Sequence, residues 1–406
     1  MLPTIVGILG TVLIWRLCHL APLAWSAGVW IIILYVLTQR ARIQTKHALL
    51  LCTLSLVFAI GAAEALLWTM DYLGATQAER DQVDEEHFND PKTGFVAFLS
   101  KGGPLYARPT SAGTVEHITK FHHTLVYDAH YTLDENGFRM APLAKTDGVA
   151  DCVILLGNSY TFGWGLNDSE TTKYQLASQS DVSRHIANLS SPGYSAAQAL
   201  AEIQSGMVSK LSKCNPGQTI YAVLDVLPIS ETWLISANGP RYILSNSGTV
   251  ARKGDLGQDD FILDDSVHIQ SWAFSILRNV KLYQRTLGGE RRPTDFDTKR
   301  LVAVIVATKF ELQKLYPRLH FMVTVWGDPI YVSDVGTMLS KKRKLVAALT
   351  LQDIVARDIG DILPNYNTDR AKYTLKHEFH PTAGADRMYA AYLLQHFIGI
   401  SGAGTK

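Results

Sequence analysis

A serine, a histidine and a glutamate stand at positions from which they could carry out acyl chemistry. Ser159 follows an apolar run at residues 153–156, which indicates a buried strand, and a tight turn that begins at Gly157. Open α/β sheets build their sites at the carboxyl ends of such strands. His380 stands two residues after Glu378, and a carboxylate can hold a histidine in the tautomer that activates a serine. Taken alone, the serine is also typical of an ordinary loop between a strand and a helix. The pair of His380 and Glu378, taken alone, is also typical of a surface patch that caps a helix.

Alternating patterns after residue 151 indicate which elements position these residues. Strand-like and helix-like segments in alternation predict a parallel sheet with helices on both faces. Residues 230–292 interrupt the alternation and indicate an insertion that is irregular or rich in β-structure. Further strands are expected at residues 184–189, 219–227, 319–326 and 350–354, and helices at residues 195–211, 294–315, 338–349 and 381–397.

The first 73 residues are nearly all apolar. Residues 21–37 form one run without a charge, and residues 47–73 contain a second run with a single acid, Glu64. Each run is close to the roughly 20 residues that span a bilayer. We therefore expect two to three transmembrane helices in residues 1–73, because the sequence leaves open whether the shorter segment at residues 2–15 also spans the bilayer. Glu64 is costly within a span unless it faces protein or water.

The charges around these segments indicate their orientation. Arg40, Arg42 and Lys46 lie between the two strong runs, whereas the sequence after residue 73 is acidic. Basic loops stay in the cytoplasm. We expect a multi-pass protein of a bacterial inner membrane, with everything after residue 73 on the periplasmic side.

Residues 74–150 indicate a soluble lead-in region. The alternating stretch at residues 127–139 turns at residues 134–137 and predicts a hairpin. Four histidines in this region make zinc conceivable, but their spacing fits no known ligand pattern. We expect strand-surface histidines and no metal site. The histidines are His117, His122, His123 and His130.

Three stretches together resemble the SGNH (GDSL-like) hydrolase family, in particular its membrane-anchored bacterial members. Residues 157–163 are similar to the family's Gly-Asp-Ser block, residues 188–194 to its Asn-Leu-x-x-Pro-Gly-Tyr block, and residues 378–381 to its final acid-x-His-Pro block. A weaker similarity covers the turn at residues 134–139. The resemblance implies a flavodoxin-like, three-layer α/β/α domain with a parallel sheet over residues 151–399.

The resemblance also implies a role for each site residue. Ser159 would attack an ester carbonyl, His380 would take its proton, and Glu378 would orient the imidazole. The backbone amides of Ser159 and Gly193 would bind the oxyanion. No metal or organic cofactor is needed for this chemistry.

The sequence departs from the family pattern in three places. Asn158 stands where the first block usually has Asp, and Glu378 stands where the last block has Asp. The third block normally supplies an oxyanion-binding Asn at the end of the strand at residues 219–227, but residues 224–230 contain no Asn and offer Asp225 in its place. An ionised carboxylate cannot donate a hydrogen bond. Loss of one oxyanion donor lowers rates by on the order of a hundred- to a thousand-fold.

The functional expectation is a membrane-anchored extracytoplasmic serine esterase or deacetylase. It would act on ester-linked acyl groups of cell-surface glycans or lipids. A polysaccharide O-acyltransferase and a non-catalytic SGNH-like membrane assembly factor remain as alternatives. The expected partners are the lipid bilayer, the acylated substrate and another membrane protein. The chain has 406 residues and a formal net charge of +1, which gives no sign of a nucleic-acid partner.

Four cysteines are too few for a disulfide framework, but two of them could pair. Cys152 begins the first strand of the sheet, and Cys214 precedes the strand at residues 219–227. In the strand order 2-1-3-4-5 these strands are neighbours, and both cysteines fall on the face opposite Ser159. An oxidising compartment would permit a bond. Two unpaired cysteines remain an equal alternative.

Overall fold

The computed structural model describes about half of the chain in detail. The chain divides into two compact units, Met1–Arg80 with Asp259–Arg291, and Asp81–Gln258 with Arg292–Lys406. In the first unit the described strands are β9 (Phe261–Asp264) and β10 (Val267–Ile269), which pair antiparallel. The described residues are Gly61 and residues 85–89, 113–121, 123–140, 151–179, 184–228, 240–255, 261–264, 267–269, 295–327 and 335–399.

A five-stranded parallel sheet forms the centre of the second unit. Its order is β12-β11-β6-β4-β5, so the first strand along the chain lies between the second and the third. This is the flavodoxin-like order 2-1-3-4-5 that was predicted. All eight residues of β6 are buried, as expected for a parallel strand covered on both faces. The strands are β4 (Asp151–Leu156), β5 (His185–Asn188), β6 (Thr219–Val226), β11 (Leu319–Val325) and β12 (Val355–Asp358).

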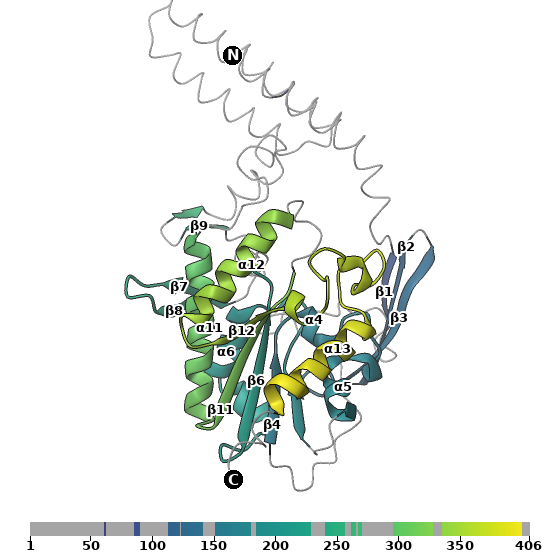
Figure 1. Cartoon of the computed structure of the whole chain (residues 1–406), viewed down its shortest axis with the longest axis horizontal. Coiled ribbons are helices and arrows are strands. Elements are labelled where there is room, and N and C mark those ends of the chain that lie inside the picture. The colour runs from purple at the N-terminus through teal and green to yellow at the C-terminus, as the bar shows by residue number, and fades with distance from the viewer. Residues whose placement is uncertain are drawn as a thin grey trace, which may run out of the picture. The chain divides into compact units, whose positions relative to one another are not determined.

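Helices cover both faces of this sheet and make a three-layer α/β/α arrangement (Figure 1). Successive side chains of β4 point to opposite faces: Ile154 packs in the core beneath α6, α11 and α12, whereas Leu155 packs in the core beneath α5 and α13. The first face carries α6 (Ala196–Gln204), α7 (Met207–Leu211), α11 (Asp295–Leu315) and α12 (Val335–Thr350), and the second α5 (Thr172–Gln179) and α13 (Ala383–Leu393).

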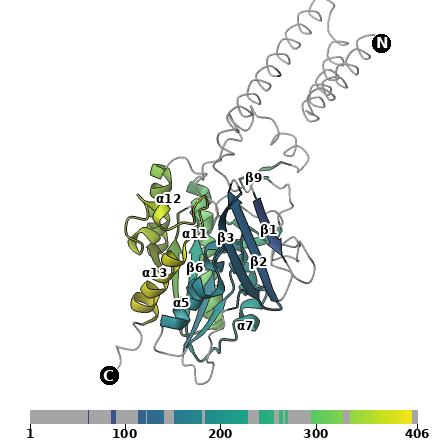
Figure 2. The same ribbon diagram turned by 90° about the vertical axis from the view of Figure 1, so that its right-hand side faces the viewer.

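An antiparallel sheet in the order β1-β2-β3 forms the described part of the lead-in region (Figure 2). The strands are β1 (Glu85–Asn89), β2 (Gly113–Phe121) and β3 (Thr124–Leu133). Tyr131 and its neighbours on one face pack against Phe162, just beyond Ser159. The predicted turn at residues 134–137 is present, and Arg139 returns to bridge Leu133. A second hairpin joins β7 (Pro240–Leu244) to β8 (Val250–Asp255).

Two of the expected helices differ from the prediction: one is divided in two, and the other begins at a later residue. The single helix expected at residues 195–211 is two helices, because Gly206 adopts φ 77° between α6 and α7. The last helix does not begin at Pro381. Thr382 is its N-cap, with the Thr382 hydroxyl accepting a hydrogen bond from the Ala385 amide. A short π-helix, η6 (Leu394–Ile398), continues it.

The fifth strand begins later than residues 350–354. Helix α12 extends to Thr350, and a turn with Asp353 at φ 53° follows. The strand starts at Val355, on the edge of the sheet, and Ala356 is the one buried residue of its four. The apolar residues before it therefore end a helix and do not form a strand.

The predicted membrane segments within residues 1–73 lie outside the described residues, apart from Gly61. Among the residues that are described, no helix has both the length and the apolar character needed to cross a bilayer.

A disulfide bond joins Cys152 and Cys214 at the amino-terminal edge of the sheet. Their Cα atoms are 5.8 Å apart, within the range that a disulfide spans. Both side chains are buried in the core beneath α6 and α11. The bond lies at the edge opposite Ser159, because β4 and β6 run parallel from the cysteines toward the serine.

Replacing both bonded cysteines with alanine should lower the free energy of unfolding by about 4 kcal/mol, because the bond closes a loop of 62 residues. Urea denaturation of Cys152→Ala/Cys214→Ala beside the wild-type chain measures this. Thiol counting on the unfolded, unreduced wild-type chain provides the check. Two free thiols are expected from its four cysteines, and four would contradict the bond.

Candidate active site

The turn between β4 and α4 (Ser159–Phe162) places Ser159 at the carboxyl edge of the sheet. Gly157 has φ 150°, and a Cβ there would lie 2.3 Å from the Thr161 hydroxyl and 3.2 Å from the Asp225 Cβ. No larger residue fits without a shift. Asn158 caps α4, with its side-chain oxygen accepting from the Tyr160 amide at 2.9 Å. The sharp turn therefore presents the Ser159 hydroxyl beyond the end of the strand.

The loop before α13 brings His380 to this serine. His380 Nε2 lies 2.8 Å from Ser159 Oγ, and His380 Nδ1 lies 2.6 Å from Glu378 Oε2. The His380 carbonyl accepts from the Leu375 amide at 2.9 Å, which ties the histidine into a closed loop. Two of the three side chains are nearly buried, with 7% of His380 and 11% of Glu378 exposed. The structure thus brings together the three residues that were expected to meet.

Glu378 is held as the charged form. Burial alone would raise the pKa of its carboxyl, but the hydrogen bond and charge of His380 oppose this. The Phe379 and His380 amides also donate to it, and the pKa lies below its usual range. A carboxylate that stays ionised can accept the Nδ1 proton of His380 and stabilise an imidazolium.

Aromatic side chains surround the His380 ring. The centroids of Phe379, Tyr160 and Trp164 lie 4.4, 5.5 and 5.7 Å from it. These rings exclude water from most of the imidazole, and charge interactions are stronger in such a site than in water. Sequence patterns did not predict this environment, because these residues come from two segments more than two hundred residues apart.

The second family-like block lies beside the first. The Ser191 amide donates to the Gly157 carbonyl at 3.4 Å, and the Asn188 side chain donates to the Thr161 carbonyl at 2.9 Å. Gly193 is exposed, has φ 75°, and has open space where a side chain would stand. A substrate can therefore approach its backbone closely. Sequence patterns did not predict the hydrogen bond from Asn188 to α4. The only sign of it in the sequence is a polar residue at the end of a buried strand.

Asp225 is hydrogen-bonded to α4. Its carboxylate accepts from the Thr161 hydroxyl at 2.8 Å and from the Tyr389 hydroxyl at 2.6 Å. Burial raises the pKa of Asp225 to about 6, although these donors oppose the shift. Asp225 therefore bonds within the core, and residues 229–239, which follow its strand, lie outside the described residues.

His117 is buried, so the expectation of a strand-surface histidine is wrong for it. Its Nδ1 lies 2.7 Å from the Tyr131 hydroxyl, and its Nε2 lies 3.3 Å from the Tyr127 hydroxyl. The Trp164 ring packs against it at 4.7 Å. The period of two along β2 turns His117 inward, and two tyrosine hydroxyls make its burial tolerable.

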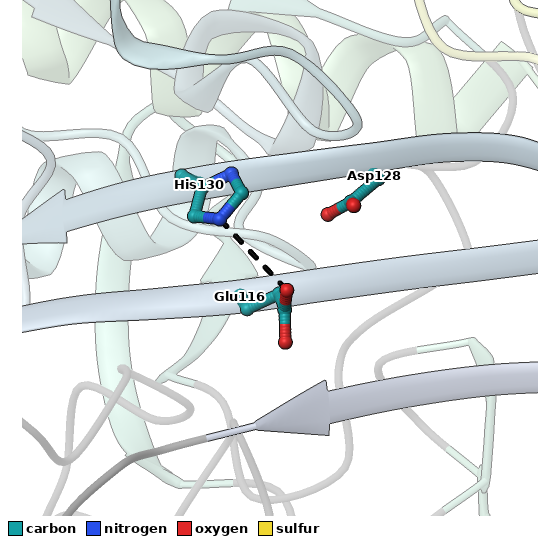
Figure 3. Close-up of side chains that lie close together, drawn as sticks. All are labelled: Glu116, Asp128 and His130. Atoms are coloured by element: carbon teal, nitrogen blue, oxygen red, sulfur yellow. Dashed lines mark ion pairs between the residues drawn. The ribbon is translucent and has the colours of Figure 1, made fainter.

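Among the residues that the structure describes, one cluster on the outer face of the lead-in sheet groups three side chains that could bind a metal. Glu116, Asp128 and His130 point toward one another from β2 and β3, with ligand atoms within 4.8 Å (Figure 3). His130 and Glu116 form an ion pair at 3.8 Å. Asp128 and His130 are exposed, and cross-strand pairs of this kind are common on sheets. We assign no metal to the cluster. His123 lies at the β2–β3 turn, and His122 lies outside the described residues.

The fold and the site together define an α/β protein with a Ser–His–Glu triad at the carboxyl edge of a parallel sheet. A serine bonded to a histidine that is oriented by a carboxylate serves as the nucleophile of hydrolases on several unrelated folds. This arrangement is able to carry out acyl-transfer chemistry, whatever the sequence similarity.

Comparison by sequence finds no matching family model and no matching curated protein. Solved structures with a similar fold include a member of the lipolytic G-D-S-L family from Veillonella parvula, 14% identical with a TM-score of 0.35 over 61% of this chain and 99% of that chain. The esterase EstA from a Pseudoalteromonas species is 12% identical, with a TM-score of 0.33 over 62% and 98%. Est24, a carbohydrate acetylesterase from Sinorhizobium meliloti, is 11% identical, with a TM-score of 0.33 over 62% and 99%. These values are too low to transfer a function, so we derive it from the site.

Asp225→Asn should remove a pH-dependent part of the stability. Because the folded pKa of Asp225 is about 6 and its ordinary value 3.8, the native state binds a proton more tightly than the unfolded state. Asp225 therefore stabilises most at low pH, and this is lost as the pH rises from about 4 to about 6. The wild-type minus variant difference in unfolding free energy should fall by about 2 kcal/mol between about pH 4 and pH 7. Urea denaturation at both values measures it, and a difference that does not vary with pH would contradict the assignment.

Proposed function

We propose that this chain is a membrane-anchored serine ester hydrolase of the SGNH type, which removes ester-linked acyl groups from cell-surface glycans or lipids. One observation carries the proposal: the hydrogen-bonded line from Ser159 Oγ through His380 to Glu378, with distances of 2.8 and 2.6 Å. A non-catalytic assembly factor would not need these side chains to lie within hydrogen-bond distance of one another. Both values lie within the reach that a general base requires.

The geometry supports a two-step mechanism. His380 Nε2 takes the Ser159 proton as Oγ attacks the ester carbonyl, and Glu378 stabilises the resulting imidazolium. The backbone amides of Ser159 and Gly193 receive the oxyanion. His380 then returns the proton to the leaving alcohol, and an acyl-enzyme forms. Water, activated by the same histidine, releases the acyl group and restores the serine.

Two observations support an extracytoplasmic site. The apolar runs in residues 1–73 are long enough to span a bilayer, and the basic residues between them favour a cytoplasmic loop. The Cys152–Cys214 bond is independent of these runs, and disulfides persist chiefly in oxidising compartments. Acyl esters of surface glycans and lipids are the substrates available there.

Ser159→Ala and His380→Ala should each reduce the hydrolysis of p-nitrophenyl acetate by at least roughly ten-thousand-fold, because nucleophile and base act as one unit. Glu378→Gln should have a smaller effect, since it keeps the hydrogen bond and loses only the charge. A serine-directed fluorophosphonate should label the wild-type chain and not Ser159→Ala.

Ser209→Ala is the matched control, because Ser209 is an exposed serine on α7. Circular dichroism would establish that each variant is folded. Full activity in folded Ser159→Ala would overturn the hydrolase proposal. Product analysis with an added sugar acceptor separates hydrolysis from acyl transfer.

The topology has its own test. A phosphatase reporter fused after Leu73 should be active, because that enzyme folds only outside the cytoplasm, and a fusion within residues 40–46 should be inactive. Activity in the opposite pattern would contradict both the proposed location and the proposed substrate class.

A further inference from the structure

One buried arginine connects the lead-in sheet to the segment that follows the nucleophile. Arg139 stands just beyond the turn that ends β3, and only 2% of it is exposed. Its Nη1 donates to the carbonyls of Gly163 at 2.5 Å and Phe162 at 3.3 Å. Its Nη2 donates to the carbonyls of Leu166 and, at 3.3 Å, His130. A guanidinium is suited to this, because its five donors lie in one rigid plane.

The charge of Arg139 is matched within the same segment. Its Nε donates to the Asp168 carboxylate at 3.0 Å, and its guanidinium lies 4.3 Å from the centre of the Tyr131 ring. Asp168 also accepts from the Thr132 amide at 3.1 Å, and the Tyr131 hydroxyl accepts from the Gly165 amide at 2.8 Å. The lead-in sheet therefore holds residues 162–168, here named the clamp loop, by both its backbone and its side chains.

The clamp loop in turn fixes the nucleophile. The amides of Gly163 and Trp164 both donate to the Ser159 carbonyl, at 3.1 and 3.0 Å. The Trp164 ring also contacts the ring of His380. The backbone of the clamp loop and the Trp164 ring both contact the triad, so a change in the shape of the loop would reach the site.

We propose that Arg139 is a positioning residue for Ser159 and His380, which acts through the clamp loop without touching either side chain. The inference rests on the proposed ester hydrolysis and adds to it a function for the lead-in sheet. Lysine keeps the charge but offers a single nitrogen, which cannot bond carbonyls on several sides at once. Arg139→Lys should therefore release the loop while leaving a cation opposite Asp168.

The test compares Arg139→Lys, Arg139→Ala and wild type in the full chain, with p-nitrophenyl acetate as the probe. At a temperature where circular dichroism finds the chains folded, Arg139→Lys should lower kcat by on the order of a hundred-fold, because small misplacements of reacting groups have effects of this size. KM should stay within about two-fold, since Arg139 is buried and its proposed effect is on the placement of the reacting groups. Low, non-denaturing guanidinium should partly restore kcat in Arg139→Ala, whereas an equal concentration of sodium chloride should not.

Arg184→Lys is the matched control. Arg184 is also poorly exposed and ion-paired, at 3.8 Å from Asp151, but it lies at the opposite edge of the sheet from Ser159. Its kcat should be unchanged. Hydrogen exchange gives a second readout: the Gly163 and Trp164 amides should exchange faster in Arg139→Lys, while amides of α11 should not change.

A kcat for Arg139→Lys equal to that of Arg184→Lys would overturn the inference. So would a loss of activity that only follows the unfolded fraction and is not restored by guanidinium. Failure of the proposed function is read separately, on the wild-type chain alone, as an absence of both hydrolysis and fluorophosphonate labelling.

Discussion

The hydrogen bond between Ser159 and His380 joins two side chains that are 221 residues apart in the sequence, and the surrounding unit is arranged so that it can form. One such bond contributes only about 1 kcal/mol, so it cannot itself hold two segments together. Packing must place both groups first. The parallel sheet does so, because β4 ends directly before the serine, and the helix that follows the histidine packs on the same sheet.

The buried carboxylate of Asp225 links the segment that carries Ser159 to the helix that follows His380. Asp225 bonds Thr161 in the helix that begins with the nucleophile, and Tyr389 in the helix that follows the base. Tyr389 also bonds the Thr324 hydroxyl on β11. Burying a carboxylate is costly, as the raised pKa of Asp225 reflects, and such a group is tolerated where donors satisfy it. The lead-in sheet adds a separate contact, because Phe121 stacks on His377, one residue before Glu378.

The sequence patterns predicted what depends on local burial. The apolar runs of β4 and β6 identified the centre of the sheet, and the blocks around Ser159 and His380 identified side chains that do meet. Patterns could not identify partners that the fold brings from elsewhere. Arg139 was noted only as part of a turn, and nothing nearby in sequence predicts that it bonds carbonyls some 25 residues later. The late start of β12 was missed for a related reason, because an edge strand is half exposed and lacks a continuous apolar run.

The departures from the family pattern differ in what they change. The cap of α4 needs one acceptor oxygen, which Asn158 supplies as well as an aspartate would, without burying a further charge. Glu378 reaches the histidine at 2.6 Å and stays ionised, so its extra methylene does not alter its role. In the proposed mechanism a missing side-chain donor for the oxyanion weakens the stabilisation of the transition state, and the backbone amides of Ser159 and Gly193 are the donors proposed to remain. The three side chains of the proposed triad thus remain within hydrogen-bond distance of one another. The expected consequence of the third departure is a slower reaction of the same kind, since the bonds formed and broken depend on the triad and not on the number of oxyanion donors.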